Sequence, residues 1–184
     1  MKHILTCPKC GNSSTPDANS FYKCLTCDWN SEINTLDISY KDSISAPLSN
    51  LFPHKFVIDG VECQSMESFI QSLRERDIEL QKSICSDYSG MMAYKMRLAL
   101  NDWRKEGDVY WQGKTICRFS DEYTLLMTKA YNCLFEQNIL FRTVLERFKD
   151  YYLIHSIGCD DISETLLTEH EYIYQLNRLK SKLK

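Results

Sequence analysis

Residues 55–73 read KFVIDGVECQSMESFIQSL, and this stretch indicates the kind of domain it belongs to. Two short runs rich in β-branched and aromatic residues flank Asp59-Gly60, a strong short-range signal for a tight β-hairpin. Ser65 then offers an N-cap side chain to a helix with apolar residues every three to four positions. These apolar residues are Met66, Phe69, Ile70 and Leu73. The stretch predicts a short hairpin that leads directly into an amphipathic helix.

Further helices are predicted towards the C-terminus. Ser120 can cap a helix that carries Asp121 and Glu122 in its first turn, where carboxylates interact favourably with the helix dipole. Asn138 is expected to begin the next helix. Thr168-Glu169-His170-Glu171 forms a capping box for a C-terminal helix. We therefore predict a mainly α protein, with a compact helical domain that contains one short β-hairpin.

Length and composition exclude several classes of protein. The 184 residues have room for one ordinary domain and a small module, and 43% of them are hydrophobic. The net charge of −3 gives no general attraction to nucleic acid or anionic lipid, so a polyanion would need a local basic patch. Charges interrupt every apolar run well before the roughly 18 residues of a membrane span, and no signal peptide opens the chain. We expect a soluble, cytoplasmic protein that makes no membrane contact.

Four of the nine cysteines form two close pairs, Cys7-Pro8-Lys9-Cys10 and Cys24-Leu25-Thr26-Cys27. Two intervening residues let one tight turn direct both sulfurs of a pair towards the same ion, and Gly11 suits that turn. The pattern predicts a structural zinc held by Cys7, Cys10, Cys24 and Cys27. Four thiolates complete the coordination shell, so this zinc would leave no position for substrate. The other five cysteines are expected to be mostly buried and reduced.

The cysteine pairs also suggest how the chain is divided. We predict a β zinc ribbon over residues 1–35, a connector over 36–46 and the helical domain over 47–184, with Leu36–Tyr40 as the last ribbon strand. Two readings of the aromatic residues in the ribbon stay open. They can stack on nucleic-acid bases beside a few basic residues, or they can cover the ribbon's own small core. The aromatic residues are Phe21, Tyr22 and Trp29, and the basic residues are Lys2, His3, Lys9 and Lys23.

No common catalytic motif is present: we find no phosphate-binding loop, dinucleotide turn, HExxH or nucleophile elbow. Polar residues nevertheless occur where a purely structural segment has little use for them. Glu67 and Gln71 lie one turn apart on the first helix, and Asn50 precedes the hairpin. Two polar loops, 110–118 and 155–161, contain the other candidate site residues.

Several segments around these polar residues resemble the NADAR superfamily, whose domains are linked to NAD and ADP-ribose metabolism and include N-glycosidases. The individual motifs are short, but their order and spacing are specific, and the resemblance covers residues 47–184. The segments are PLSNLFP (47–53), FVIDG (56–60), SMESFIQ (65–71), FEQN (135–138), LIHSIGCD (153–160) and ETLLT (164–168).

The resemblance implies that residues 47–184 form a NADAR-like catalytic domain. It implies hydrolysis of the C–N bond at the ribose anomeric carbon, with no redox cofactor and no catalytic metal. Removal of ADP-ribose from a modified nucleobase is the preferred reading, because a zinc ribbon can dock nucleic acid. One alternative is an N-glycosidase acting on riboflavin-pathway intermediates. Another is a non-catalytic module that binds ADP-ribose or NAD and docks nucleic acid or protein through the ribbon.

Two acids are predicted to carry the reaction, Glu67 and Asp160. Positive charge builds on the sugar as the base leaves, water must attack the anomeric carbon, and the leaving nitrogen gains a proton. A pair of carboxylates can meet these demands. Substrate contacts are predicted for Asn50 at the ribose hydroxyls, Arg118 at phosphate and Trp111 as a stacking ring, with Gln71 and His155 beside them.

Two departures from the family pattern bear on these roles. Ser163-Glu164-Thr165 replaces the family's Trp-Gly, and for that reason the stacking role is moved to Trp111. The family's common lysine one turn beyond the glutamine is Arg74 here.

Five of these candidates also have a plain structural explanation. Glu67 suits the positive end of a helix, and Asp160 suits a turn. Trp111 can fill the core. His155 and Gln71 can be buried polar groups with satisfied hydrogen bonds.

Overall fold

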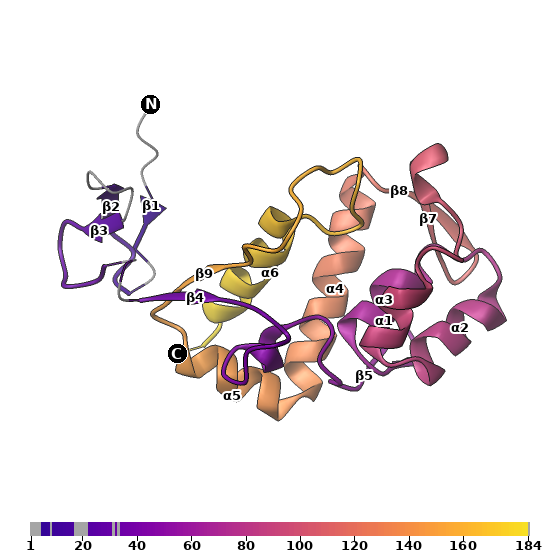
Figure 1. The fold of residues 1–184 in the computed structure, drawn as a ribbon, viewed down its shortest axis with the longest axis horizontal. Coiled ribbons are helices and arrows are strands. Elements are labelled where there is room, and N and C mark those ends of the chain that lie inside the picture. The colour runs from indigo at the N-terminus through magenta and orange to yellow at the C-terminus, as the bar shows by residue number, and fades with distance from the viewer. Residues whose placement is uncertain (1–4, 8, 17–21, 31, 33, 184) are drawn as a thin grey trace.

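The computed structural model describes residues 5–7, 9–16, 22–30, 32 and 34–183. Within these residues the chain forms a small three-stranded sheet near the N-terminus and a larger helical domain with three two-stranded sheets (Figure 1). The mainly α expectation is confirmed, with six α-helices in the described part of the chain. No described helix has both the length and the apolar character of a membrane span.

The elements follow one another from the ribbon into the helical domain. The α-helices are α1 (Met66–Ser72), α2 (Ile78–Asp87), α3 (Gly90–Met96), α4 (Asp121–Gln137), α5 (Ile139–Arg147) and α6 (Glu169–Lys180). Short 3-10 helices are η1 (Ala46–Leu48) and η2 (Trp103–Lys105). The strands are β1 (Leu5–Thr6), β2 (Ser13–Pro16), β3 (Tyr22–Cys24), β4 (Thr35–Asp37), β5 (Phe56–Ile58), β6 (Val61–Cys63), β7 (Asp108–Trp111), β8 (Lys114–Cys117) and β9 (Tyr152–Ile154).

The predicted helix starts are confirmed by their caps. Ser65 accepts a hydrogen bond from the Ser68 N–H at 3.0 Å and forms a capping box at the start of α1. Thr168 forms the predicted capping box with Glu171 at the start of α6. The side chains of Ser120 and Asn138 cap α4 and α5 by accepting a hydrogen bond from a backbone N–H of the first turn. Local side-chain chemistry therefore fixes where each of these helices begins.

The predicted hairpin is also present, as β5 and β6. Ile58 pairs with Val61 around Asp59-Gly60, and these two turn residues have φ values of 50° and 79°. Positive φ at both central positions is the requirement of a type I′ turn, which explains the Asp-Gly pair. The hairpin buries Phe56 and Ile58 against the helical core.

The strand predicted at Leu36–Tyr40 was assigned to the wrong sheet. The strand observed there, β4, pairs in parallel with β9, so that Leu36 lies opposite Leu153. Leu36 and Ile38 are buried, and Leu36 and Leu153 both belong to the core of the helical domain. The sequence did not reveal this pairing for two reasons. The periodicity of β4 is weak, and its partner strand β9 lies more than 100 residues further along the chain.

Helix α4 lies at the centre of the helical domain and contacts α1, α5 and α6 (Figure 1). Its apolar side chains are buried along one face, and Tyr131 and Ala130 have no exposed surface. The expectation for the scattered cysteines holds only in part. Cys63 and Cys85 are buried, whereas Cys117 and Cys159 are exposed because they lie in a short hairpin and a loop.

Trp29 joins the ribbon to the helical domain. Its indole N–H donates to the Asp150 carbonyl at 2.8 Å, its ring meets Tyr152 edge-on, and only 2% of the residue is exposed. This ring is therefore covered and unavailable for stacking on a base. Tyr22 lies 6.5 Å from the same Tyr152 ring, and Phe21 lies outside the described residues.

Candidate active site

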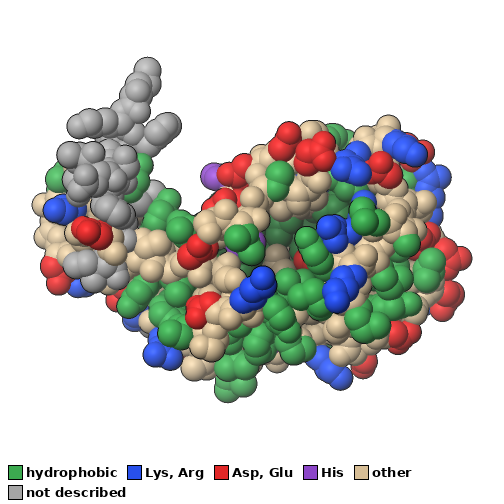
Figure 2. Space-filling model, in the orientation of Figure 1, with side chains coloured by type: hydrophobic (Ala, Val, Ile, Leu, Met, Phe, Trp, Pro, Cys, Tyr) green, Lys and Arg blue, Asp and Glu red, His purple; other side chains and the backbone are tan. Residues whose placement is uncertain are grey.

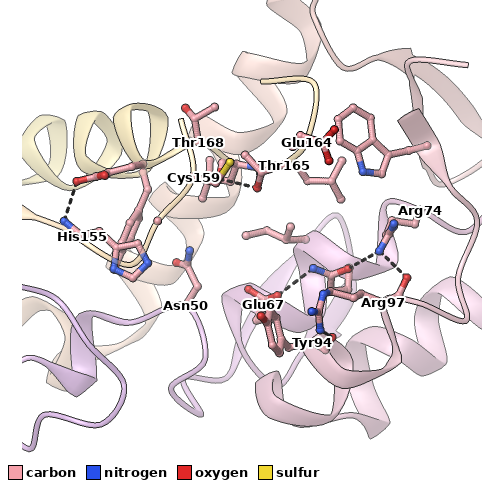
Figure 3. Close-up of a pocket in the computed structure, with 18 of the residues that line it drawn as sticks. Asn50, Glu67, Arg74, Tyr94, Arg97, His155, Cys159, Glu164, Thr165 and Thr168 are labelled. Atoms are coloured by element: carbon pink, nitrogen blue, oxygen red, sulfur yellow. Dashed lines mark hydrogen bonds between the residues drawn. The ribbon is translucent and has the colours of Figure 1, made fainter. Parts of the chain in front are cut away.

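A cavity of about 360 Å³ opens between α1, α3 and η2 on one side and residues 155–169 on the other. Figure 2 shows this face hollowed, with basic side chains below and to the right of the hollow and acidic side chains above it. In Figure 3, Glu67, Arg74, Tyr94 and Arg97 lie on the α1–α3 side, opposite Cys159, Glu164 and Thr165. The structure brings four of the predicted site residues into this cavity: Asn50, Glu67, Gln71 and His155.

Glu67 is the acid that the fold places in the cavity wall. It lies in the first turn of α1, and its backbone N–H donates to the Asn50 carbonyl at 2.8 Å. Its carboxyl accepts a hydrogen bond from the Gln71 amide at 2.9 Å. Burial raises the pKa of Glu67 above its usual value, although Gln71 and Arg97 oppose that rise. The carboxyl therefore keeps its proton to a higher pH than an exposed glutamate does.

Asn50 is oriented towards the cavity by a buried tyrosine. The Tyr131 hydroxyl donates to the Asn50 amide oxygen at 2.7 Å, and Tyr131 is fully buried in α4. Burial raises the pKa of Tyr131 well above its usual value, so the hydroxyl remains a donor. Since the amide oxygen is engaged, the Asn50 NH₂ group is the one available to an acceptor in the cavity.

Three arginines line the same cavity, namely Arg74, Arg97 and Arg104. Arg74 is 8% exposed and donates to the backbone carbonyls of Asn101 and Arg97. In the part of the chain that the structure describes, no carboxylate lies within ion-pair distance of Arg74 or Arg97. Burial lowers the pKa of Arg74, but a guanidinium remains charged at neutral pH. Arg74 and Arg97 therefore give the wall positive charge that suits an anionic ligand, whereas Arg104 is paired with Asp102 and Glu164.

Arg97 and Arg104 were missed as site residues. Arg97 is the C-cap of α3 and Arg104 lies in η2, in a stretch without a motif, and only the packing of these elements brings both residues to the cavity. In the sequence, Arg74 was noted only because it replaces a lysine that is common in the NADAR superfamily. Its position three residues after Gln71, just beyond the end of α1, was the usable signal.

Asp160 does not line the cavity, although its neighbour Cys159 does. Its carboxylate accepts a hydrogen bond from the His170 N–H at 2.8 Å, in the first turn of α6. The first N–H groups of a helix have no partner within the helix, and an acid nearby satisfies one of them. In this structure the side chain is thus engaged at the helix end and not beside Glu67.

Arg118 is likewise placed outside the cavity. Its side chain is buried and donates both terminal nitrogens to the Glu171 carboxylate, at 2.9 and 2.6 Å. Although burial opposes the change, hydrogen bonds from Arg118 lower the pKa of Glu171. Arg118 also donates to the Thr165 carbonyl. It therefore supports a cavity-lining loop and has no free donor pair for phosphate.

Trp111 is part of the core, as its structural explanation allowed. Only 5% of the residue is exposed, and its ring meets Phe69 edge-on with centroids 5.0 Å apart. The indole N–H donates to the Asp59 carboxylate at 2.9 Å. Its place at the end of β7 turns it towards the hairpin and α1, so it cannot stack on a ligand in the cavity.

We expect Trp111→Phe to lower the free energy of unfolding by about 1–3 kcal/mol, because it removes a hydrogen bond to a carboxylate while keeping an aromatic ring. Denaturant titration measures this loss, and calorimetric titration with ADP-ribose provides the comparison. Affinity should stay within about twofold of wild type. A weaker affinity for ADP-ribose with an unchanged free energy of unfolding would show that Trp111 contacts the ligand.

The four predicted metal ligands lie together at the N-terminus. The sulfur atoms of Cys7, Cys10, Cys24 and Cys27 are all within 4.8 Å of one another, with Cys7–Cys27 at 3.8 Å and Cys10–Cys24 at 3.5 Å. Tetrahedral zinc–sulfur bonds of about 2.3 Å require sulfur separations of about 3.8 Å. Hydrogen bonds from backbone N–H groups lower the pKa of Cys24 to about 6, and the largest contribution comes from the N–H of Thr26. The cluster is a site that can hold a metal ion.

The fold is similar to that of the NMR structure of the E. coli protein YbiA. The two chains superpose with a TM-score of 0.55 at 17% sequence identity, covering 82% of this chain and 84% of that one. YbiA is a NADAR-family protein, so the likeness shows that this chain has a fold of the NADAR type. The resemblance predicted from the sequence is thus confirmed at the level of the fold.

The sequence comparisons show a phage protein family. The chain belongs to the bacteriophage protein GP30.3 family, whose model matches residues 42–181. It is similar to the "Uncharacterized 17.1 kDa protein in Gp30-rIII intergenic region" of Enterobacteria phage T4, with 33% identity over 140 residues. That alignment covers 76% of this chain and 91% of the relative. All residues of the cavity lie inside the matched region.

Proposed function

We propose that this protein is an N-glycoside hydrolase that removes ADP-ribose from a modified nucleobase. The observation that carries the proposal is the pairing, in one cavity, of a carboxyl with a raised pKa and a set of arginines. The carboxyl can exchange a proton with a leaving base, and the arginines can hold phosphate. The NADAR-type fold supports the same reaction class.

The reaction needs one proton and one water molecule. The neutral Glu67 carboxyl gives its proton to the leaving nitrogen as the bond from that nitrogen to the ribose anomeric carbon breaks. A water oxygen then bonds to that carbon and passes a proton to the Glu67 carboxylate, which restores the acid. The Gln71 amide, bound to the same carboxyl at 2.9 Å, holds it in one orientation throughout. Asp160 has no assigned step, because its carboxylate is engaged at α6.

The cavity also favours a substrate with phosphate groups. Its volume of about 360 Å³ is at the lower end of small-molecule sites, which span roughly 300–1,000 Å³. A ribosyl phosphate portion therefore fills it and leaves the rest of the substrate outside. Leu98 and Ile157 line the cavity and are 83% and 75% exposed, so they offer apolar surface beside its opening.

We also propose that the cysteine cluster holds structural zinc. Four thiols at tetrahedral spacing favour zinc and close the shell, so the metal would stabilise the ribbon and take no part in hydrolysis. The preference for a base within nucleic acid rests on this ribbon. A comparison of modified DNA with small-molecule substrates tests this preference.

The test is to incubate the purified protein with ADP-ribosylated DNA, NAD and riboflavin-pathway intermediates, and to measure the released sugar by mass spectrometry. We expect free ADP-ribose from the modified DNA. If sugar is released only from a riboflavin-pathway intermediate, the proposed substrate is wrong, but the proposed hydrolysis of an N-glycosidic bond still holds. Binding of ADP-ribose without any turnover would show a binding module and overturn the enzyme proposal.

A further inference from the structure

Strand β4 lies beside the strand that leads into the cavity-lining residue His155, which is labelled in Figure 3. It pairs in parallel with β9, and the ladder continues as the Ile38 N–H donates to the Ile154 carbonyl at 2.9 Å. The next residue after this bond is His155, which lines the cavity. The end of β4 is thus in register with the start of a cavity wall.

Asp37 binds Ser156, which lies between the cavity-lining residues His155 and Ile157. Its carboxylate accepts a hydrogen bond from the Ser156 N–H at 3.0 Å, and its other oxygen accepts from the Ser156 hydroxyl. One side chain therefore fixes both the backbone and the side chain of Ser156. Hydrogen bonds to a charged acceptor are stronger than those between neutral groups.

The carbonyl that follows Asp37 fixes the imidazole ring of His155. The ring nitrogen Nδ1 lies 2.7 Å from the Ile38 carbonyl oxygen. A carbonyl can only accept, so Nδ1 carries the proton in this arrangement and Nε2 of a neutral ring is left as an acceptor. The ring also meets Tyr172 edge-on with centroids 5.3 Å apart, which limits its rotation.

The rest of the loop is packed closely on this ring. A Cβ added at Gly158 would lie 3.0 Å from the His155 Cδ2 atom and 2.9 Å from the Glu169 Cβ atom. The His155 N–H donates to the Glu169 carboxylate at 3.0 Å. A movement of the ring therefore has to move Gly158 and the adjoining wall, since no free space separates them.

We propose that Asp37 is a positioning residue for ligand binding, which acts through Ser156 and holds His155 in the Nδ1-protonated form. This inference rests on the proposed function, because it takes the cavity as the ligand site. Asp37 lies before residue 42, where the match to the family model begins. The segment that follows the ribbon would thus contribute to the cavity without lining it.

The experiment compares wild type with Asp37→Ala, Asp37→Asn, Ser156→Ala and the double variant Asp37→Ala/Ser156→Ala. Glu62→Ala, which removes an exposed acid on β6, is the matched control. Calorimetric titration with ADP-ribose gives the dissociation constant. The ¹⁵N spectrum of the His155 ring, assigned with His155→Gln, reports which nitrogen carries the proton. Thermal melting checks that every variant is folded.

We expect Asp37→Ala to raise the dissociation constant about tenfold and to mix the ring tautomers, with little change in melting temperature. Asp37→Asn keeps an acceptor for Ser156 and should recover most of the affinity. The double variant should be no worse than Asp37→Ala, because both changes remove the same contact. An unchanged ring spectrum and unchanged affinity in Asp37→Ala would overturn the proposal. If wild type does not bind ADP-ribose, the proposed function fails, and the ring spectrum alone decides whether Asp37 positions His155.

Discussion

Glu67→Gln is expected to lower the turnover number by about 10²- to 10⁴-fold, the usual contribution of a general acid–base group. Glutamine keeps the size and shape of the side chain and can still contact Gln71, but it has no proton to give to the leaving nitrogen. Affinity for ADP-ribose should stay within a fewfold of wild type, because phosphate recognition is assigned to the arginines. Single-turnover release of ADP-ribose measures the chemical step directly.

The pH dependence of the rate distinguishes the loss of a general acid from a change in the shape of the site. Burial raises the pKa of Glu67 above its usual value of about 4.5, so the active neutral form persists to higher pH and the rate falls as the pH rises through the raised pKa. Glu67→Gln should lose this descending limb together with the rate. Full activity in Glu67→Gln, or an unchanged descending limb of its pH–rate profile, would show that Glu67 is not the general acid.

Stability provides an independent control on the same substitution. A carboxyl whose pKa is raised on folding stabilises the protein below its unfolded pKa, and this contribution is lost as the pH rises through the folded pKa. Above the folded pKa the ionised Glu67 is therefore unfavourable in the fold, and in that pH range Glu67→Gln should unfold at the same or a higher denaturant concentration. Glu62→Gln, a change at an exposed acid, should alter neither turnover nor stability.

The elements that the sequence predicted well are those determined by neighbouring residues. Asp59-Gly60 fixes its own turn through two positive φ values, and Ser65 and Thr168 each cap their helix within three residues. Glu67 and Gln71 could be placed on one wall because i and i+4 share a helix face. Such signals do not depend on the rest of the fold, so they can be read from sequence alone.

The parts that were missed depend on contacts between distant segments. Strand β4 has few distinguishing residues, and only its pairing with β9 defines it as a strand of the helical domain. Arg118 was expected at phosphate because it is a cation in a polar loop. Its Glu171 partner lies 53 positions later, and no local pattern links the two. Trp111 shows the same difficulty, since its contacts with Phe69 and Asp59 come from other elements.

Cys24→Ser is expected to abolish metal binding and unfold the ribbon, while the helical domain keeps most of its helix. Structural zinc contributes about 10–16 kcal/mol of apparent binding free energy in small modules of this kind, which is most of their folding free energy. A serine hydroxyl is a poor replacement for a thiolate ligand. Metal analysis by mass spectrometry should find one zinc per wild-type chain and none in the variant. Far-ultraviolet circular dichroism should show little loss of helix.

Two details of the structure make this last prediction specific. Trp29 is buried on Tyr152 and donates to Asp150, so unfolding of the ribbon should expose this indole and shift its fluorescence to longer wavelength. Cys117→Ser is the matched control, because Cys117 is an exposed free thiol outside the cluster, and it should keep both the metal and the spectrum of wild type. Iron in place of zinc, or no stoichiometric metal in protein made in a reducing cytosol, would contradict the zinc assignment. Retained metal in Cys24→Ser would show that the four thiols do not act as one site.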